Sequence, residues 1–563
     1  MSSLGKSADR TYAQQEGQYE CLFFHNSFDR IGFYCVAKVV KINVFDKSFR
    51  IFANLLPRGD AMELTIVLCF LAYTLLLFGV MWLSSRRSAD NDAFFRGQRR
   101  SPWFVVAYGM IGASLSGVTF MSVPGGVYSG QFTYLPLVFG YVLGYAVIAL
   151  LLLPLYYKLN LTSIYSYLKQ RFGQSSEKTG ALFFLLSRLL GSSLRMYLVV
   201  FVLYEFVFRS WGVPFWVPAV VFIAIILAYT FRGGVKTVVW TDTLQTTFLL
   251  LAAAVTVIVI LQRIDLSLPQ LLQRSRDMGF TRIWETDFTA PKYYWKQIVS
   301  GAFITITMTG LDQDMMQKNL TCKSLRDAQK NVLTSSLLFV VVNMLFLTLG
   351  AALLAYAATS GFALPVNEAG VVVGDKIFPS IAFTLGPLTT ILFVLGMVAA
   401  GYSSADGTLT ALTTTFCYNF LGFDKAEKDK DYKFSIGKCQ ISPLATRRWV
   451  HVAFALLYLL VMMAFRPFHN QSLIDTLFDI AGFTYGPLLG LFCFGMFSRR
   501  QVHDRWVPLV AVLSPVLCYI LKIKSPVWFG GYHFGFELLL INGLLTYLGL
   551  LLISYTHPSC EKE

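Results

Sequence analysis

Two aspartates stand inside long apolar segments of this 563-residue chain. Asp242 lies in the run GGVKTVVWTDTLQTTF, and Asp406 lies in the hydroxyl-rich run MVAAGYSSADGTLTALTTTF. A carboxylate at membrane depth is costly unless it is paired, solvated or protonated. Carboxylate, hydroxyl and carbonyl oxygens are the ligands that hard cations prefer. Asp242 and Asp406, together with nearby serines, could therefore form one cation site.

An arginine, instead of a bound cation, could be the partner of either acid. Arg188 and Arg195 lie seven residues apart in another apolar segment, so a helix would carry them on one face. Either arginine could pair with an acid, or could hold an anionic solute group through its fork of donors. We favour pairing within the protein. The hydroxyls around Asp406 also have a structural interpretation, because a helical hydroxyl can donate to the carbonyl one turn back.

Composition indicates the elements that must position these residues. Hydrophobic residues make up 55% of the chain and charged residues 14%, and the mean hydropathy is +0.57. A soluble protein carries roughly a quarter charged residues. The formal net charge is +15, but the basic residues lie mostly in short loops between apolar runs, as membrane topology requires. The sequence therefore predicts the lipid bilayer, and no nucleic acid, as a partner.

The apolar runs predict membrane spans, since a hydrocarbon core about 30 Å thick takes about 20 apolar residues per helix. We expect an all-α polytopic membrane protein with about thirteen transmembrane helices. One run, 380–420, is too long for a straight span and should contain a loop-to-helix entry or a long tilted helix. The predicted spans are 63–84, 103–130, 133–156, 178–208, 214–231, 238–262, 296–317, 331–357, 380–420, 448–465, 473–497, 505–522 and 535–556.

Basic residues give the spans a direction. Lys and Arg are more frequent on the side of the membrane where the first span ends, and the positive-inside rule places this side in the cytoplasm. We expect a multi-pass protein of the cell membrane, with its N-terminus outside and a cytoplasmic tail at 557–563. The basic residues that follow the first span are Arg86, Arg87, Arg96, Arg99 and Arg100.

The first 61 residues differ from the rest of the chain. They carry charge throughout and lack the basic, apolar and small-residue order of a signal peptide. Met62 is followed at once by the apolar run ELTIVLCFLAYTLLLFGVMWL. We expect Met62 to be the true start, with residues 1–61 a misassigned extension or a disordered tail.

Two predicted spans carry features that interrupt a helix. The second contains GMIGASLSGVTFMSVPGG, in which the glycines and Pro124 weaken a helix, although close packing through small residues is an alternative for the glycines. Five spans later, in SGAFITITMTGLDQDMMQKN, Gly310 precedes Asp312. Interrupted helices in corresponding positions indicate the binding site of an inverted-repeat transporter, with halves here at 103–262 and 296–497.

These residues resemble the sodium/solute symporter family, whose members carry sugars, proline, sialic acid, iodide, vitamins and other small solutes. The resemblance covers residues 62–556 and rests on five motifs in family order: GASLSG…FMSVPGGVY, GGVKTVVWTDTLQ, GLDQDMMQKNLTCKS, YSSADGTLT and GPLLGLFCFGMF. It implies the leucine-transporter-like fold, with one leading helix, a five-plus-five inverted repeat containing two broken helices, and trailing helices at 505–556. It also implies that inward sodium flow drives the uptake of a small polar or anionic organic solute by alternating access.

The resemblance also implies a set of sodium ligands. Alignment of SLSG…VPGG with the family places two carbonyl ligands at Gly112 and Leu115. Two hydroxyl ligands of the same ion come from Ser403 and Ser404.

Some family members have a second sodium site, which here would use Asp242. Its other ligands are usually hydroxyl residues, whereas this chain has Asp406 and Gly407 at the matching positions. The extra carboxylate could strengthen a second sodium site, admit a proton or meet an arginine.

The candidate substrate residues are Thr119, Asp312 and Arg195. Asp312 falls where sugar-carrying members place a polar substrate contact, but two other sugar contacts are lost at Thr119 and Phe478. Simple sugars are therefore not expected, and Arg195 leaves room for a carboxylate-bearing solute. The alternatives are a proton-coupled or uncoupled transporter or channel of the same fold. We expect no enzyme, because the six histidines show no metal-ligand spacing and no nucleophile motif is visible.

Overall fold

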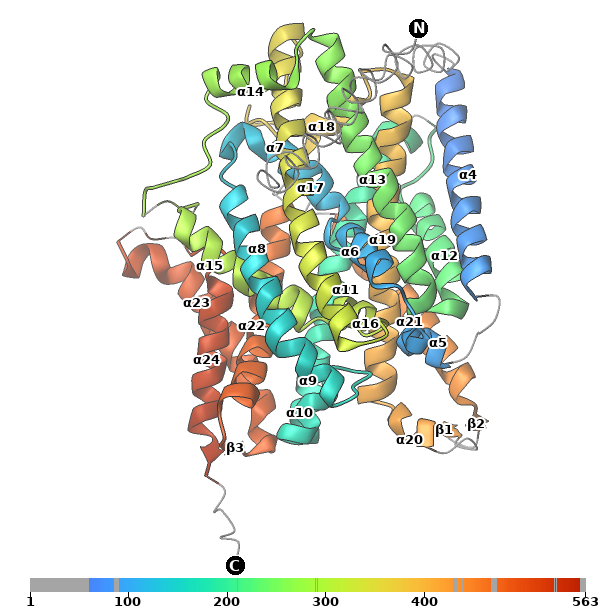
Figure 1. Cartoon of the computed structure of the whole chain (residues 1–563), viewed down its shortest axis with the longest axis vertical. Coiled ribbons are helices and arrows are strands. Elements are labelled where there is room, and N and C mark those ends of the chain that lie inside the picture. The colour runs from blue at the N-terminus through green and yellow to red at the C-terminus, as the bar shows by residue number, and fades with distance from the viewer. Residues whose placement is uncertain are drawn as a thin grey trace, which may run out of the picture. The chain divides into compact units, whose positions relative to one another are not determined.

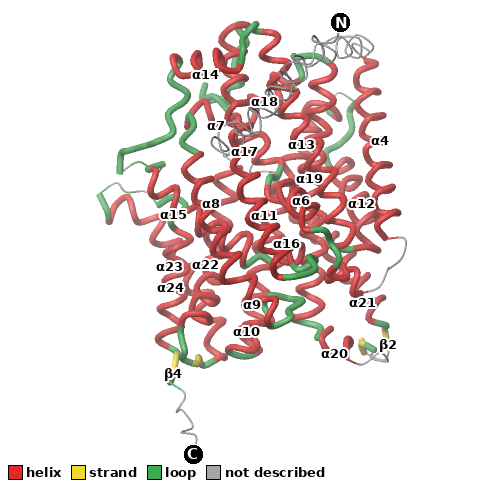
Figure 2. Tube along the Cα trace, in the orientation of Figure 1, coloured by secondary structure: helices red, strands yellow, loops and turns green. Residues whose placement is uncertain are grey.

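The chain folds mainly into helices, as the computed structural model shows (Figure 2). The structure describes residues 60–85, 91–209, 211–288, 290, 292–428, 433–436, 439–466, 473–530, 532 and 534–556. The described residues fall within one compact unit that begins at Arg58. The expectations for residues 1–59 of the N-terminal extension and for the tail 557–563 lie outside the described residues.

Within the described ranges, nine helical spans are long and apolar enough to cross a membrane, or ten if one bent pair is counted as a span. Two shorter apolar helical stretches run over Trp216–Phe231 and Leu538–Leu552. The all-α polytopic prediction is confirmed, whereas the count of thirteen is not. The longer helices are α4 (Asp60–Ser85), α8 (Leu135–Val147), α11 (Gln174–Leu203), α12 (Trp216–Gly233), α13 (Val235–Arg263), α17 (Leu325–Ser360), α19 (Pro387–Asn419), α21 (Pro443–Ala464), α22 (Leu473–Phe497), α23 (Val507–Trp528) and α24 (Leu538–Leu552).

Short helices and π-turns connect or extend these spans. Two π-helical turns, η2 (Ile148–Leu152) and η3 (Tyr204–Phe208), continue α8 and α11. Other short helices are α5 (Asn91–Arg96), η1 (Gly97–Arg99), α9 (Leu153–Lys158), α10 (Ser166–Arg171), α14 (Leu268–Asp277), α18 (Gly374–Ala382), α20 (Phe423–Lys428) and η6 (Asp504–Trp506).

The second predicted span is broken. Helix α6 (Trp103–Ser114) stops before Leu115 and Ser116, which are extended, and α7 (Gly117–Gly130) then continues at an angle of 63°. The prediction of an interrupted helix is confirmed, but Pro124 lies inside α7 and not at the break.

The seventh predicted span is divided as well. It consists of α15 (Tyr294–Thr305), the π-turn η4 (Ile306–Gly310) and α16 (Gln313–Asn319). Leu311 and Asp312 separate η4 from α16, and the Asp312 side chain caps α16 by accepting from the Met315 backbone N–H. The run 380–420 is also divided, because α18 ends at Ala382 and α19 begins at Pro387, as a loop-to-helix entry requires.

Helix α19 lies at the centre of the bundle. Its most apolar stretch is 94% buried, against 22% for α4 and for the span containing α23. Helix α13 packs against α19, α6 and α4, and α11 packs against α19 and α22 (Figure 1). The acids of α13 and α19 and the arginines of α11 therefore lie in protein rather than in lipid.

Two short antiparallel strand pairs are the sheet structure of the described residues. Strands β1 (Phe434–Ile436) and β2 (Cys439–Ile441) form a hairpin in register Ser435–Gln440. Strands β3 (Gln501–Val502) and β4 (Ser554–Tyr555) join the segment after α22 to the end of α24.

Candidate functional site

The break between α6 and α7 exposes backbone oxygens in the centre of the protein. Gly112 belongs to the last turn of α6, whose final carbonyls lack helical N–H partners, and Leu115 lies in the extended segment that follows. The Gly112 N–H donates to Thr246 Oγ1 of α13 at 3.1 Å. A β-carbon at Gly112 would overlap this hydroxyl, so glycine allows the close approach of α13. Both predicted carbonyl positions therefore lie at the break.

The two predicted hydroxyl ligands on α19 have different surroundings. Ser403 Oγ donates to Asp242 Oδ1 at 2.5 Å. Ser404 Oγ is buried and has no hydrogen-bond partner among the described residues, and the same holds for Ser116 Oγ at the break. Most buried polar atoms of folded proteins are hydrogen-bonded, so these two oxygens are exceptions. The α6–α7 break and α19 therefore each present an unsatisfied hydroxyl oxygen.

Asp242 is paired with a lysine. Lys318 of α16 places Nζ 2.9 Å from Asp242 Oδ2 and 3.2 Å from Asp314 Oδ1, and all three side chains are at most 2% exposed. The structure thus brings Asp242 and Ser403 together, although the resemblance assigned them to two different sodium sites. It differs from the expected arginine pairing, because the partner of Asp242 is Lys318.

Arg188 forms ion pairs with two other acids. Its Nε lies 3.0 Å from Asp312 Oδ2, and its Nη2 lies 2.7 Å from Asp314 Oδ2. Tyr485 of α22 donates to the same Asp312 oxygen at 2.5 Å. Both oxygens of Asp312 are thus occupied, one by the α16 cap and one by Arg188 and Tyr485. Asp312 positions α16 and Arg188 in this structure.

Asp406 forms no ion pair among the described residues. Its Oδ2 accepts from Tyr229 at 2.8 Å, from Thr241 at 3.3 Å and from Gln245 at 3.4 Å. Its Oδ1 accepts from the Gly407 backbone N–H at 2.6 Å. The carboxylate is fully buried and is satisfied by neutral donors. The structure does not bring Asp406 into contact with an arginine.

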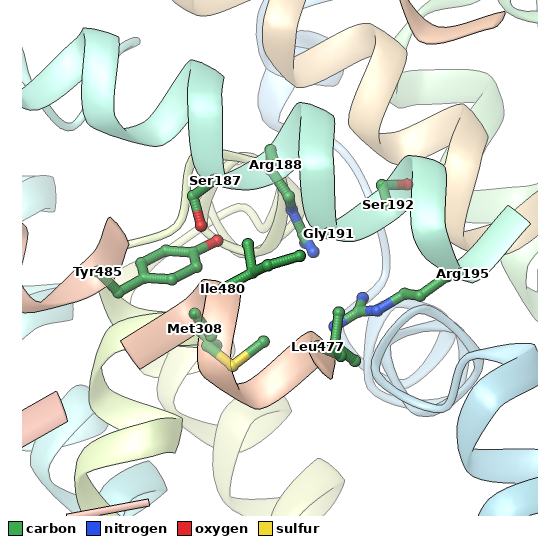
Figure 3. Close-up of a pocket in the computed structure, with 10 residues that line it drawn as sticks. Ser187, Arg188, Gly191, Ser192, Arg195, Met308, Leu477, Ile480 and Tyr485 are labelled. Atoms are coloured by element: carbon green, nitrogen blue, oxygen red, sulfur yellow. The ribbon is translucent and has the colours of Figure 1, made fainter. Parts of the chain in front are cut away.

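A small pocket, with a cavity volume of about 10 Å³, lies between α11, η4 and α22 (Figure 3). Arg195 and Arg188 both line it, with Met308 and Tyr485 on other sides. Arg195 is 7% exposed, and its Nε has no hydrogen-bond partner within the part of the chain that the structure describes. Thr119 is half-buried on α7 and is not among the lining residues. The lining residues are Ser187, Arg188, Gly191, Ser192, Arg195, Met308, Leu477, Ile480, Ala481 and Tyr485.

Comparisons with known proteins identify the family of the chain. The profile of the sodium:solute symporter family matches residues 94–503. The chain belongs to this family. It is 26% identical over 448 residues to the sodium/sialic acid symporter NanT of Aliivibrio fischeri, covering 77% of this chain and 83% of the relative. It is 25% identical over 462 residues to the sodium/sialic acid symporter SiaT of Proteus mirabilis, covering 78% and 86%.

The fold is that of a solved family member. A structure of a Na⁺-coupled sialic acid symporter, in a substrate-bound outward-open state, superposes with a TM-score of 0.72 at 21% identity. The match covers 88% of this chain and 99% of the solved chain. As a sodium:solute symporter, the protein is a multi-pass membrane transporter in which inward sodium flow drives uptake of a small solute.

Sequence reasoning missed the partners of the acids in this symporter. Lys318 and Asp314 were not weighed, although both belong to the segment GLDQDMMQKN expected at membrane depth. An ionisable residue inside a membrane segment is itself a signal of function, and a spacing of four residues places Asp314 and Lys318 on one helical face. Tyr229 gave no such signal, because a tyrosine in an apolar helix is common.

Proposed function

We propose that this symporter takes up a small carboxylate-bearing solute, whose carboxylate is held by Arg195. The observation that carries the proposal is the contrast between two buried arginines of α11. Both arginines line the pocket, but Arg188 is neutralised by Asp312 and Asp314, whereas Arg195 forms no ion pair among the described residues. A buried guanidinium without a carboxylate partner is costly, and an anionic ligand would supply two parallel hydrogen bonds.

The relatives support an acidic solute. NanT and SiaT are named as sialic acid symporters, and sialic acid carries a carboxylate. The polar lining offered by Ser187, Ser192 and Tyr485 would accept hydroxyl or amide groups of such a solute. Thr119 of α7 stays a proposed substrate residue although it does not line this pocket, and Asp312 would act through Arg188 and Tyr485 and not by direct contact.

We propose that one sodium ion binds at the α6–α7 break. Its ligands would be the carbonyls of Gly112 and Leu115 and the hydroxyls of Ser403 and Ser404. The unsatisfied Ser404 hydroxyl and the freed carbonyls of α6 support this assignment. Such oxygens suit an alkali cation because they supply hard donors without a fixed charge.

Alternating access would move two structural repeats around these sites. We propose residues 103–262 and 296–497 as the repeats, each opening with an interrupted helix, flanked by the leading helix 63–84 and the trailing helices 505–556. The two interrupted elements, α6–α7 and α15–η4–α16, support this division. We also propose that the N-terminal end of α4 faces outside and the C-terminal tail is cytoplasmic, because basic residues are more frequent on the latter side.

A thermal-shift screen of the purified full-length transporter tests the solute class. Small carboxylates and their neutral amide analogues are compared in sodium chloride and in choline chloride. A ligand that binds only the folded state raises the unfolding midpoint. We expect stabilisation by a carboxylate in sodium only. Stabilisation by the amide analogue as strongly as by the acid would refute the role of Arg195.

A further inference from the structure

Lys318 lies where three helices of the charged centre meet. It extends from the short helix α16 and is 1% exposed. Its Nζ pairs with Asp242 of α13 and with Asp314 one turn earlier on α16. A lysine is not buried at membrane depth without such partners, because an isolated ammonium there is costly. Lys318 is therefore held as a charged group by two carboxylates.

Helix α19 leaves room for this ammonium. A β-carbon at Gly407 would lie 2.7 Å from Lys318 Nζ and would overlap Asp314 Oδ1. Any side chain at this position, including a hydroxyl residue able to bind a cation, would compete with Lys318 for the same space. The space beside Asp242 on α19 is thus occupied by a charge that belongs to the chain itself.

Each carboxylate oxygen of Asp242 already has one partner within the protein. Oδ1 accepts from Ser403, and Oδ2 is paired with Lys318. A sodium ion at Oδ2 would have to expel the ammonium into a buried region where Asp314 is already shared with Arg188. Removing one partner of a buried ion pair leaves an uncompensated charge and is strongly unfavourable.

We propose that Lys318 is a built-in cation that takes the place of a second sodium ion at Asp242, so that the transporter binds one sodium ion per cycle. The inference rests on the proposed sodium site at the α6–α7 break. It concerns how many sodium ions bind, and not whether transport requires sodium. Lys318 also belongs to a row of alternating charges, Asp242, Lys318, Asp314, Arg188 and Asp312, in which Arg188 lines the solute pocket. The ammonium of Lys318 thus connects Asp242 to the solute pocket through ion pairs within the protein, without a second sodium ion.

Equilibrium binding of ²²Na⁺ to the purified full-length transporter tests this proposal. We expect one sodium ion per protein in the wild type and in Lys318→Arg, which keeps the charge. We expect two in Lys318→Met, because the neutral side chain frees an oxygen of Asp242. Two ions in the wild type, or one ion in a folded Lys318→Met variant, would overturn the proposal.

A charge-neutral double variant keeps the test decisive if Lys318→Met alone does not fold. Asp242→Asn combined with Lys318→Met removes both charges of the pair together. It is expected to retain one bound sodium ion, and loss of that ion would show that Asp242 itself holds it and would refute the inference. A wild type that binds no sodium would instead refute the proposed sodium site, so the two failures are distinguishable.

Discussion

Replacing Gly407 by alanine should destabilise the charged centre. The new methyl group would lie 2.7 Å from Lys318 Nζ and would overlap Asp314 Oδ1, whereas non-bonded carbon contacts are normally about 3.5–4.0 Å long. Neither side chain can turn away freely, because Asp314 is held by Arg188 and Lys318 is held by Asp242. Inserting a methyl group into a packed core costs about 1–3 kcal/mol. We expect the free energy of unfolding of Gly407→Ala to fall by this amount.

The control for this variant is Gly126→Ala. Gly126 lies inside α7, and a β-carbon there would meet no atom within 4 Å. Alanine is favoured over glycine within a helix by about 1 kcal/mol, so the control should be neutral or slightly stabilised. Thermal unfolding in detergent, followed by tryptophan fluorescence, compares both variants with the wild type. Equal unfolding midpoints for Gly407→Ala and Gly126→Ala would refute the packing described around Lys318.

Two further predictions concern the pocket and the start of α11. Arg195→Gln should weaken binding of a carboxylate solute about 10- to 100-fold and leave sodium binding intact. The reason is the loss of a charged hydrogen bond, which contributes about 1.5–3 kcal/mol. Unchanged solute affinity in a titration would contradict this prediction. Asp504→Ala should lower the free energy of unfolding by about 1–2 kcal/mol, because its carboxylate accepts from the backbone N–H groups of Ser175 and Ser176 at 2.8 Å. Asp504→Asn, which keeps an acceptor, should lose less, and equal unfolding midpoints for both variants would argue against the cap.

The fold was largely predictable because lipid imposes length and composition on each span. The apolar runs located the long helices, and the small-residue stretch before Pro124 located a broken one. The position of that break was less predictable. Proline removes a hydrogen bond from a helix interior, yet Pro124 lies inside α7, and the chain leaves the helix earlier, at Leu115 and Ser116. Tertiary contacts, not local propensity, determine where the backbone opens.

The acids and hydroxyls at membrane depth could be recognised from the sequence, but their partners could not. The hydrogen bond between Asp242 and Ser403 joins residues that the resemblance assigned to two different sodium sites. Lys318 was not expected as the partner of Asp242. Lys318 follows a helix break, and the geometry of that break cannot be derived from the sequence. The same geometry directs Asp312 toward Arg188 and away from a free substrate-binding position. Pairing across a break depends on the path of the chain, which residue type alone does not reveal.

The most direct test of the account is sodium-driven uptake by proteoliposomes that contain the full-length protein and a carboxylate solute identified by the thermal-shift screen. The wild type should concentrate the solute only when an inward sodium gradient is imposed. The double variant Ser403→Ala/Ser404→Ala should remain folded and lose concentrative uptake. Normal sodium dependence in the folded double variant would contradict the assignment of the driving ion to the α6–α7 break and α19.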